Sequence, residues 1–349
     1  MNKVWPDPIH IGPRAVGAGA PVLVVAEAGV NHNGKLATAI RLCRAASEAG
    51  ADAVKFQAFS ADRLVTAGAP AASYQRAADQ RKLLSELELS PLELAQVKAE
   101  CDALGLIFLA TPFSPRDVAN LHGMGVSAIK IASPDLANPP LLRIAAATGL
   151  PIIMSTGAST MEEVEHAVEV LSTSGCRELV LLHCVSNYPT PQNHLNLRGI
   201  HTLGRRFQLP VGLSDHTVEP DTASFAVAAG AVLLEKHLTL SRQQYGPDHF
   251  FSVEPEELSA YVGATRRSEA ILGHGRREPS NGEQEIRKIA RSSVVSAQAI
   301  IAGAKIERTM LTVKRPAGGI EPARLEEVVG KTAAADIPAD TTLRWEMIQ

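Results

Sequence analysis

The chain has 349 residues, of which 45% are apolar, so it can bury a large core. Its 34 basic and 37 acidic residues give a net charge of −3 and form no cationic block, which argues against nucleic acid or an anionic membrane as a partner. Its 4 cysteines show neither CxxC spacing nor the density of a disulfide scaffold. The N-terminal residues lack the apolar core of a signal peptide, and no run is long enough to span a membrane. We expect a cytoplasmic protein that acts on a small molecule.

Eight short apolar runs recur along the chain. In chain order they are VLVVA (22–26), AVKF (53–56), LIFLA (106–110), AIKI (128–131), PIIM (151–154), LVLL (179–182), PVGL (210–213) and VLLE (232–235). Uninterrupted runs of this kind are typical of parallel strands that are buried on both faces. The pattern therefore predicts a parallel sheet.

Amphipathic helical segments alternate with these runs. Segments 35–49 and 160–172 carry apolar residues along one helical face. Glycines that can end such helices are Gly50, Gly105, Gly125, Gly149, Gly175 and Gly230. Strand and helix units repeated eight times over about 250 residues predict an α/β protein with a (β/α)8 TIM barrel, and a doubly wound open sheet is the alternative.

The character of the sequence changes after a helix predicted at 255–272. We expect a TIM-barrel domain at 1–272, a polar linker at 273–290 and a small β-rich domain at 291–349. The last segment repeats at an offset of 37 residues. The repeat relates Ile300, Ala302, Ile306, Met310 and Leu311 to Ile337, Ala339, Leu343, Met347 and Ile348. Two similar half-units predict a small pseudo-symmetric β module.

Polar or charged residues follow all eight predicted strands. The active site of a TIM barrel lies at the carboxyl ends of its strands, so these residues are the site candidates. From the first strand to the eighth they include Glu27, Lys55, Gln57, Thr111, Phe113, Lys130, Ser133, Ser155, Asn187, Tyr188, Ser214, Asp215, His216, Glu235, Lys236 and His237. A capping hydroxyl or a solvated charge would explain any one of them, but not all eight strand ends together.

Two histidines, His216 and His237, follow the seventh and eighth strands and should lie side by side. Two neutral imidazoles, with the remaining positions left to water or substrate oxygens, suit a divalent Lewis acid, preferably Mn²⁺, with Mg²⁺ or Co²⁺ as alternatives. A buried structural histidine is the alternative for either residue alone. A zinc site with three protein ligands is not expected, because no third ligand presents itself at matching depth.

Two lysines, Lys55 and Lys130, should project into the mouth of the barrel from the second and fourth strands. Two cations there favour an anionic substrate. Groups that can help them to bind a carboxylate and a phosphate together belong to Thr111, Ser133, Ser155, Asn187 and Ser214. No Walker-type loop or GxGxxG motif follows a strand, which argues against nucleotides. A Schiff-base aldolase stays open, because a buried lysine can act as a nucleophile.

The motifs along the chain resemble those of the sialic acid synthase family. They are AEAGVNHNG (26–34), VKFQ (54–57), TPFS (111–114), KIAS (130–133), STGA (155–158), CVSNYPTP (184–191), GLSDHT (212–217), EKHLTL (235–240), GPDHFFSVEPEEL (246–258) and VKRP (313–316). They span almost the whole chain in family order. The resemblance implies that the C-terminal module is an antifreeze-like SAF domain of the β-clip type, swapped between the subunits of a homodimer.

The resemblance also implies roles for the candidate residues. His216 and His237 would be catalytic metal ligands, and Glu27 would handle a proton or stabilise a cationic centre. The phosphoenolpyruvate site would comprise Lys55, Thr111, Lys130, Ser133, Ser155, Asn187 and Ser214. The residues facing the sugar and the reacting carbons would be Glu27, Gln57, Tyr188 and Asp248, with Phe113 nearby and Arg315 supplied by the partner subunit.

The reaction implied by the resemblance joins phosphoenolpyruvate, an N-acetylated amino sugar and water into a nonulosonic acid and phosphate. C3 of phosphoenolpyruvate attacks the metal-polarised aldehyde of the open-chain sugar, water adds at C2, and phosphate leaves by C–O cleavage. N-acetylmannosamine is one candidate sugar, and the diacetamido trideoxy hexoses that lead to legionaminic or pseudaminic acid are the alternative. The rival classes are a metal-dependent aldolase or isomerase and a non-catalytic sugar-binding protein.

Overall fold

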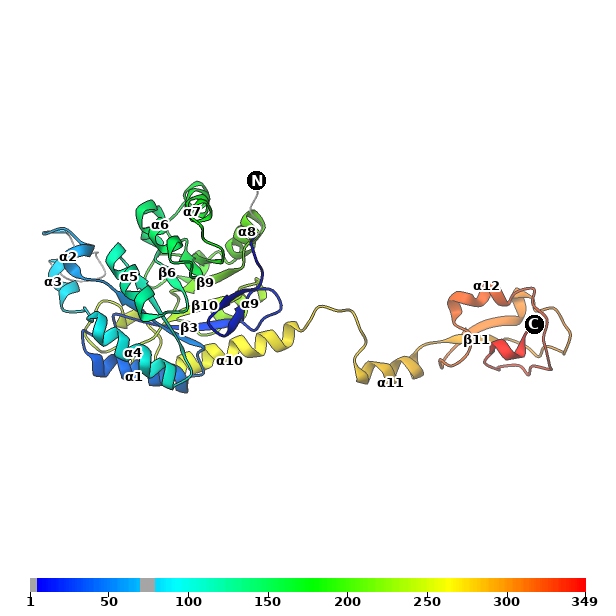
Figure 1. Ribbon diagram of the computed structural model, residues 1–349. Helices are drawn as coiled ribbons and strands as arrows, with labels where there is room; N and C mark the ends of the chain where they lie inside the picture. Colours follow the sequence, from blue (N-terminus) through cyan, green and yellow to red (C-terminus); the bar gives the residue numbers. More distant parts are fainter. Residues whose placement is uncertain (1–4, 70–78) are drawn as a thin grey trace. The chain divides into compact units, whose positions relative to one another are not determined.

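The computed structural model describes residues 5–69 and 79–349. The chain divides into two compact units, Met1–His274 and Gly275–Gln349 (Figure 1). In the first unit, parallel strands close into a barrel in the order β10-β3-β4-β5-β6-β7-β8-β9. These strands are β3 (Leu23–Gly29), β4 (Ala53–Ala58), β5 (Ile107–Pro112), β6 (Ile129–Ile131), β7 (Ile152–Ser155), β8 (Leu179–Cys184), β9 (Val211–Asp215) and β10 (Leu233–His237). The predicted TIM barrel is confirmed, and the open sheet is excluded.

Side chains of the barrel strands alternate between two apolar regions, because successive residues of a strand point to opposite faces. On β3, for example, Leu23 and Val25 pack inside the barrel, whereas Val24 and Ala26 pack against the surrounding helices. Glu27 has the same parity as Leu23 and Val25, so it continues the inward row at the carboxyl end of the strand. The barrel interior is therefore apolar below and charged at its mouth.

Helices surround the barrel, and glycines and capping side chains define their ends. The helices of the first unit are α1 (Leu36–Glu48), α2 (Ala61–Leu64), α3 (Gln80–Ser85), α4 (Pro91–Ala103), α5 (Pro115–Met124), α6 (Pro139–Ala147), α7 (Met161–Thr173), α8 (Arg198–Phe207), α9 (Thr222–Ala228) and α10 (Pro255–Leu272). Ser90 and Thr160 form capping boxes that begin α4 and α7. All six glycines predicted to end helices have φ between +71° and +96°. Among the described residues, no helix is both long and apolar enough to cross a bilayer.

An N-terminal hairpin, which the sequence patterns did not predict, packs below the barrel. Its strands are β1 (Ile9–Ile11) and β2 (Arg14–Val16). Ile9, Ile11 and Val16 are fully buried in the same cluster as the inward-facing apolar side chains of the strands. The hairpin thus covers the apolar base of the barrel interior.

The second unit contains α11 (Asn281–Ala290), β11 (Ser293–Ser296), β12 (Leu311–Lys314) and α12 (Leu325–Val328). Helix α11 lies within the segment 273–290 that was predicted as a linker. The repeat is visible in the structure: Ile300 and Ile337 exchange two backbone hydrogen bonds of 2.8 Å. The two 3-10 turns Arg308–Met310 and Trp345–Met347 occupy equivalent positions at the same offset of 37 residues. The two half-units therefore form one pseudo-symmetric core.

Candidate active site

A polar cavity of about 90 Å³ lies at the carboxyl ends of the barrel strands. Every barrel strand, or the loop that follows it, contributes to its lining. The predicted site residues that line it are Glu27, Lys55, Gln57, Thr111, Phe113, Lys130, Ser133, Ser155, Tyr188, Ser214, His216 and His237. The fold thus brings together side chains that are more than 200 positions apart in the sequence.

Three residues with a predicted role in the site do not line this cavity. Asp248 is buried in the loop after β10, and its Oδ2 atom lies 4.0 Å from Nδ1 of His237. Asn187 is exposed in the loop after β8, next to Tyr188. Arg315 is exposed in the second unit, directly after β12. Their roles stay predictions.

Lys55 is the centre of a buried charge cluster. Its Nζ atom lies 2.8 Å from Oε2 of Glu27 and 3.7 Å from Oε2 of Glu235, and it donates a hydrogen bond of 3.1 Å to Thr111. Burial lowers the pKa of Lys55, but Glu235 and Glu27 outweigh that effect and leave the pKa raised. Burial raises the pKa of Glu27 to about 7, although Lys55 opposes the change. Glu27 can therefore hold or release a proton near neutral pH.

Lys130 has mainly neutral neighbours. It donates hydrogen bonds to Oγ of Ser155 at 2.7 Å and to the carbonyl of Ile131 at 3.1 Å, and Glu235 lies 3.9 Å away. Burial lowers the pKa of Lys130. The Oγ atom of the nearby Ser133 accepts a hydrogen bond of 2.9 Å from the backbone N–H of Gly157. This side of the cavity is rich in donors, as an anion site requires.

Glu235 is the site residue to which the sequence patterns gave no role. Its carboxylate lies near both lysines and accepts a hydrogen bond of 3.0 Å from Ser214. Burial raises its pKa, but Lys130 and Lys55 outweigh burial and lower it. The signal that could have found Glu235 is its position two residues before His237, which puts both side chains on the inward face of β10. Cys184 also lines the cavity and lacked a predicted role.

The two predicted metal ligands lie side by side, with the ring centroids of His216 and His237 5.4 Å apart. Nδ1 of His216 is 2.9 Å from the carbonyl of Val185, which can only accept, so this nitrogen carries a proton and Nε2 is left as the ligand atom. Burial lowers the pKa of His237 well below its ordinary value. Its buried Nδ1 has no hydrogen-bond partner within the described residues. Burial lowers the pKa of His216, but Cys184 and the carbonyl of Val185 outweigh that effect and leave the pKa raised. The two imidazoles can bind a divalent ion in their neutral forms.

The remaining ligands of such an ion would have to be water or substrate oxygens. In residues 5–69 and 79–349, no group of three or more His, Cys, Asp or Glu side chains is placed to hold a metal. An aromatic wall closes one side of the histidine pair, because Tyr188 lies 4.4 Å from the His216 ring and Phe251 lies 4.9 Å from the His237 ring. Both histidines also line the cavity together with Lys55 and Lys130.

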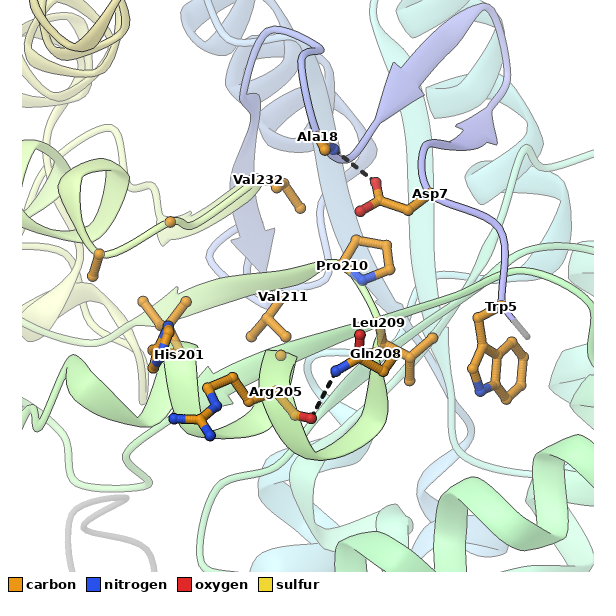
Figure 2. Close-up of a pocket in the computed structure, with 14 residues that line it drawn as sticks. Trp5, Asp7, Ala18, His201, Arg205, Gln208, Leu209, Pro210, Val211 and Val232 are labelled. Carbon is orange, nitrogen blue, oxygen red and sulfur yellow. Dashed lines mark hydrogen bonds between the residues drawn. The ribbon is translucent and has the colours of Figure 1, made fainter. Parts of the chain in front are cut away.

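A larger hollow, of about 800 Å³, lies beside the amino ends of β9 and β10. The candidate active site lies at the carboxyl ends of the same strands. Figure 2 shows Trp5, Arg205 and Pro210 among the residues that line the larger hollow. None of the described residues around it belongs to the predicted site. We assign the active site to the smaller cavity, because the catalytic groups of TIM barrels lie at the carboxyl ends of the strands.

A TIM barrel with buried lysines, carboxylates and a histidine pair at its mouth has the architecture of an enzyme that acts on an anionic substrate. Comparison with family models identifies the family to which this enzyme-like barrel belongs. The model of the NeuB family matches residues 42–277, and the model of the SAF domain matches residues 291–349. The chain belongs to the NeuB family, and its C-terminal unit is a SAF domain.

Three related proteins are similar to most of the chain. An N,N'-diacetyllegionaminic acid synthase of Legionella pneumophila is 39% identical, with 97% of each chain covered. A second synthase of that name, from Campylobacter jejuni, is 37% identical and covers 92% of this chain and 98% of its own. The crystal structure of an N-acetylneuraminic acid synthetase from Leptospira borgpetersenii, in complex with citrate, has a TM-score of 0.72 at 37% identity and covers 80% of this chain and 94% of its own.

Proposed function

We propose that the protein condenses phosphoenolpyruvate with an N-acetylated amino sugar and water, and releases phosphate and a nonulosonic acid. The observation that carries the proposal is the convergence of two buried lysines and a histidine pair on one cavity. A reaction between a phosphorylated acid and a sugar carbonyl needs both kinds of group in one place. Family membership and the names of the relatives support the same reaction.

The chain's own residues divide into binding and proton-handling groups. Lys130, with Ser155 and Ser133, forms the donor-rich side that we assign to the anions of phosphoenolpyruvate. Lys55 lies between this side and Glu27, whose pKa of about 7 suits proton exchange at the reacting carbons. His216 and His237 would hold a divalent ion, which would supply Lewis-acid polarisation of the sugar carbonyl.

Two kinds of sugar are candidates, and two of the three relatives described above favour one kind. Both the Legionella and the Campylobacter relatives are named for diacetyllegionaminic acid. We therefore expect purified protein with Mn²⁺ to release phosphate from phosphoenolpyruvate faster with a diacetamido trideoxy hexose than with N-acetylmannosamine, as a difference in kcat/KM. A higher kcat/KM with N-acetylmannosamine would assign the protein to the other sugar. Sugar turnover without phosphate release would instead indicate an aldolase or isomerase, and no turnover with any amino sugar would contradict the proposal.

Arg315 is proposed to complete the sugar site from the partner subunit of a homodimer. Its side chain is exposed, and it directly precedes the sequence PAGG. Mixing inactive His237→Ala and Arg315→Ala chains should restore up to about a quarter of the activity, because random pairing gives half heterodimers with one intact site of two. Mass spectrometry must first demonstrate subunit exchange. After exchange, no recovery would contradict the swapped arrangement, and a fully active Arg315→Ala homodimer would remove Arg315 from the site.

A further inference from the structure

Charged residues also face away from the cavity, on the two strands that carry the histidines. Ser214 and His216, like Glu235 and His237, line the cavity. Asp215 and Lys236 lie between them in the sequence and are register partners on β9 and β10. Their side chains point outward, toward α10, where the Lys236 ammonium lies 5.3 Å from the centre of the Tyr261 ring. This outward pair has no place in the proposed chemistry.

The outward pair is completely buried and its hydrogen-bonding groups are matched. The side chains of Lys236 and Asp215 are 1% and 0% exposed, and Nζ lies 3.0 Å from Oδ2. Nζ also donates to Thr217, at 2.5 Å to its carbonyl and 3.1 Å to its Oγ1. The backbone N–H of Thr217 in turn donates to Oδ1 of Asp215 at 2.9 Å. Three partners thus satisfy the three protons of the ammonium group.

The hydrogen-bond acceptors of the ammonium group belong to Asp215 and Thr217, the two neighbours of His216 in the sequence. Lys236 holds Asp215 through its carboxylate and Thr217 through its backbone carbonyl and hydroxyl. His216 is held from the other side as well, since its carbonyl accepts a hydrogen bond of 2.9 Å from Thr190. A buried ion pair is a poor source of stability, because desolvation offsets the attraction. A fully satisfied buried network does, however, fix geometry.

We propose that Lys236 is a positioning residue: by anchoring residues 215–217 to β10, it keeps the imidazoles of His216 and His237 side by side, with their ring centres 5.4 Å apart. The inference rests on the proposed function only for the metal that these imidazoles would hold. Changes in groups that orient metal ligands typically weaken metal affinity by about 10- to 100-fold. A residue that served only general stability would not alter the metal affinity of the folded protein.

The test compares the double variant Asp215→Asn/Lys236→Met with the wild type. The variant removes both charges together and keeps an acceptor for the Thr217 N–H. We expect it to fold, by circular dichroism and a cooperative thermal transition, and to bind Mn²⁺ about 10- to 100-fold more weakly by calorimetry. In the metal-free protein, ¹⁵N-histidine spectra should show shifted or broadened His216 and His237 signals. The matched control Val262→Ala, in α10, should lower the melting temperature yet leave both readouts unchanged.

Wild-type Mn²⁺ affinity together with unchanged histidine signals in the double variant would overturn the proposal. If the wild type and His237→Ala bind Mn²⁺ equally well, the proposed metal site fails, but the histidine spectra still decide the positioning role. If the double variant does not fold, Thr217→Val provides the test, because it removes the hydroxyl that accepts from Lys236 and bonds Thr222 but keeps both charges and the carbonyl acceptor. It should shift the same signals by a smaller amount, and unchanged signals would again overturn the proposal.

Discussion

Removal of divalent metal is expected to abolish turnover, and added Mn²⁺ should restore it. The physical reason is that two adjacent imidazoles, one of them with a buried nitrogen that lacks a partner among the described residues, provide nitrogen ligands for the ion. His237→Ala should remove Mn²⁺ binding in calorimetry and lower kcat to the background of the assay, while circular dichroism shows a folded barrel.

The matched control for this experiment is His166→Ala, whose side chain is exposed on α7. It should keep wild-type activity and Mn²⁺ affinity. Full turnover in excess chelator, after the metal content has been shown to be negligible, would exclude a metal-dependent reaction at this site. Loss of activity in His237→Ala with unchanged Mn²⁺ affinity would place the ion elsewhere.

Substitution of Lys130 is expected to cause the second large effect. Lys130→Met keeps most of the side-chain volume but removes a charge-assisted contact to the substrate anion, worth about 1.5–3 kcal/mol. The dissociation constant for phosphoenolpyruvate should rise about 10- to 150-fold, as measured by calorimetry or by quenching of intrinsic fluorescence. The closest contacts of Lys130 are neutral, and Glu235, which lies 3.9 Å from Lys130, keeps Lys55 as a second cation when Lys130 is replaced.

Lys55 gives a less direct test of the same anion site. Removing it leaves the carboxylates of Glu27 and Glu235 without their shared cation, so Lys55→Met should also favour the protonated form of Glu27. The control for both variants is Lys98→Ala, since Lys98 lies on α4 and pairs with Asp102. Wild-type phosphoenolpyruvate affinity in both Lys55→Met and Lys130→Met would show that the anion binds elsewhere.

The barrel and most of its cavity were predictable from the sequence, because each strand leaves a local signal. An uninterrupted apolar run marks a strand buried on both faces, and the polar residue that follows it marks the carboxyl end. Lys55, Lys130 and the two histidines all stand at such strand ends, so their place at the barrel mouth follows from the sequence pattern alone. The N-terminal hairpin was missed because its strands are three residues long, too short for a periodic pattern.

The charged residues at the end of β10 show what the local sequence pattern does not predict, which is the direction of each side chain. Glu235, Lys236 and His237 are consecutive, and the preceding run is apolar on both faces. In the sequence, only the predicted metal role of His237 indicates which of the three side chains point inward. Pairing with β9 and packing against α10 decide it, placing Glu235 beside the lysines and Lys236 on Asp215. The sequence by itself determined the barrel, the repeat in the second unit and the set of polar strand ends. Only the tertiary structure decided which charges meet, because electrostatic partners are chosen by distance in space and not by spacing along the chain.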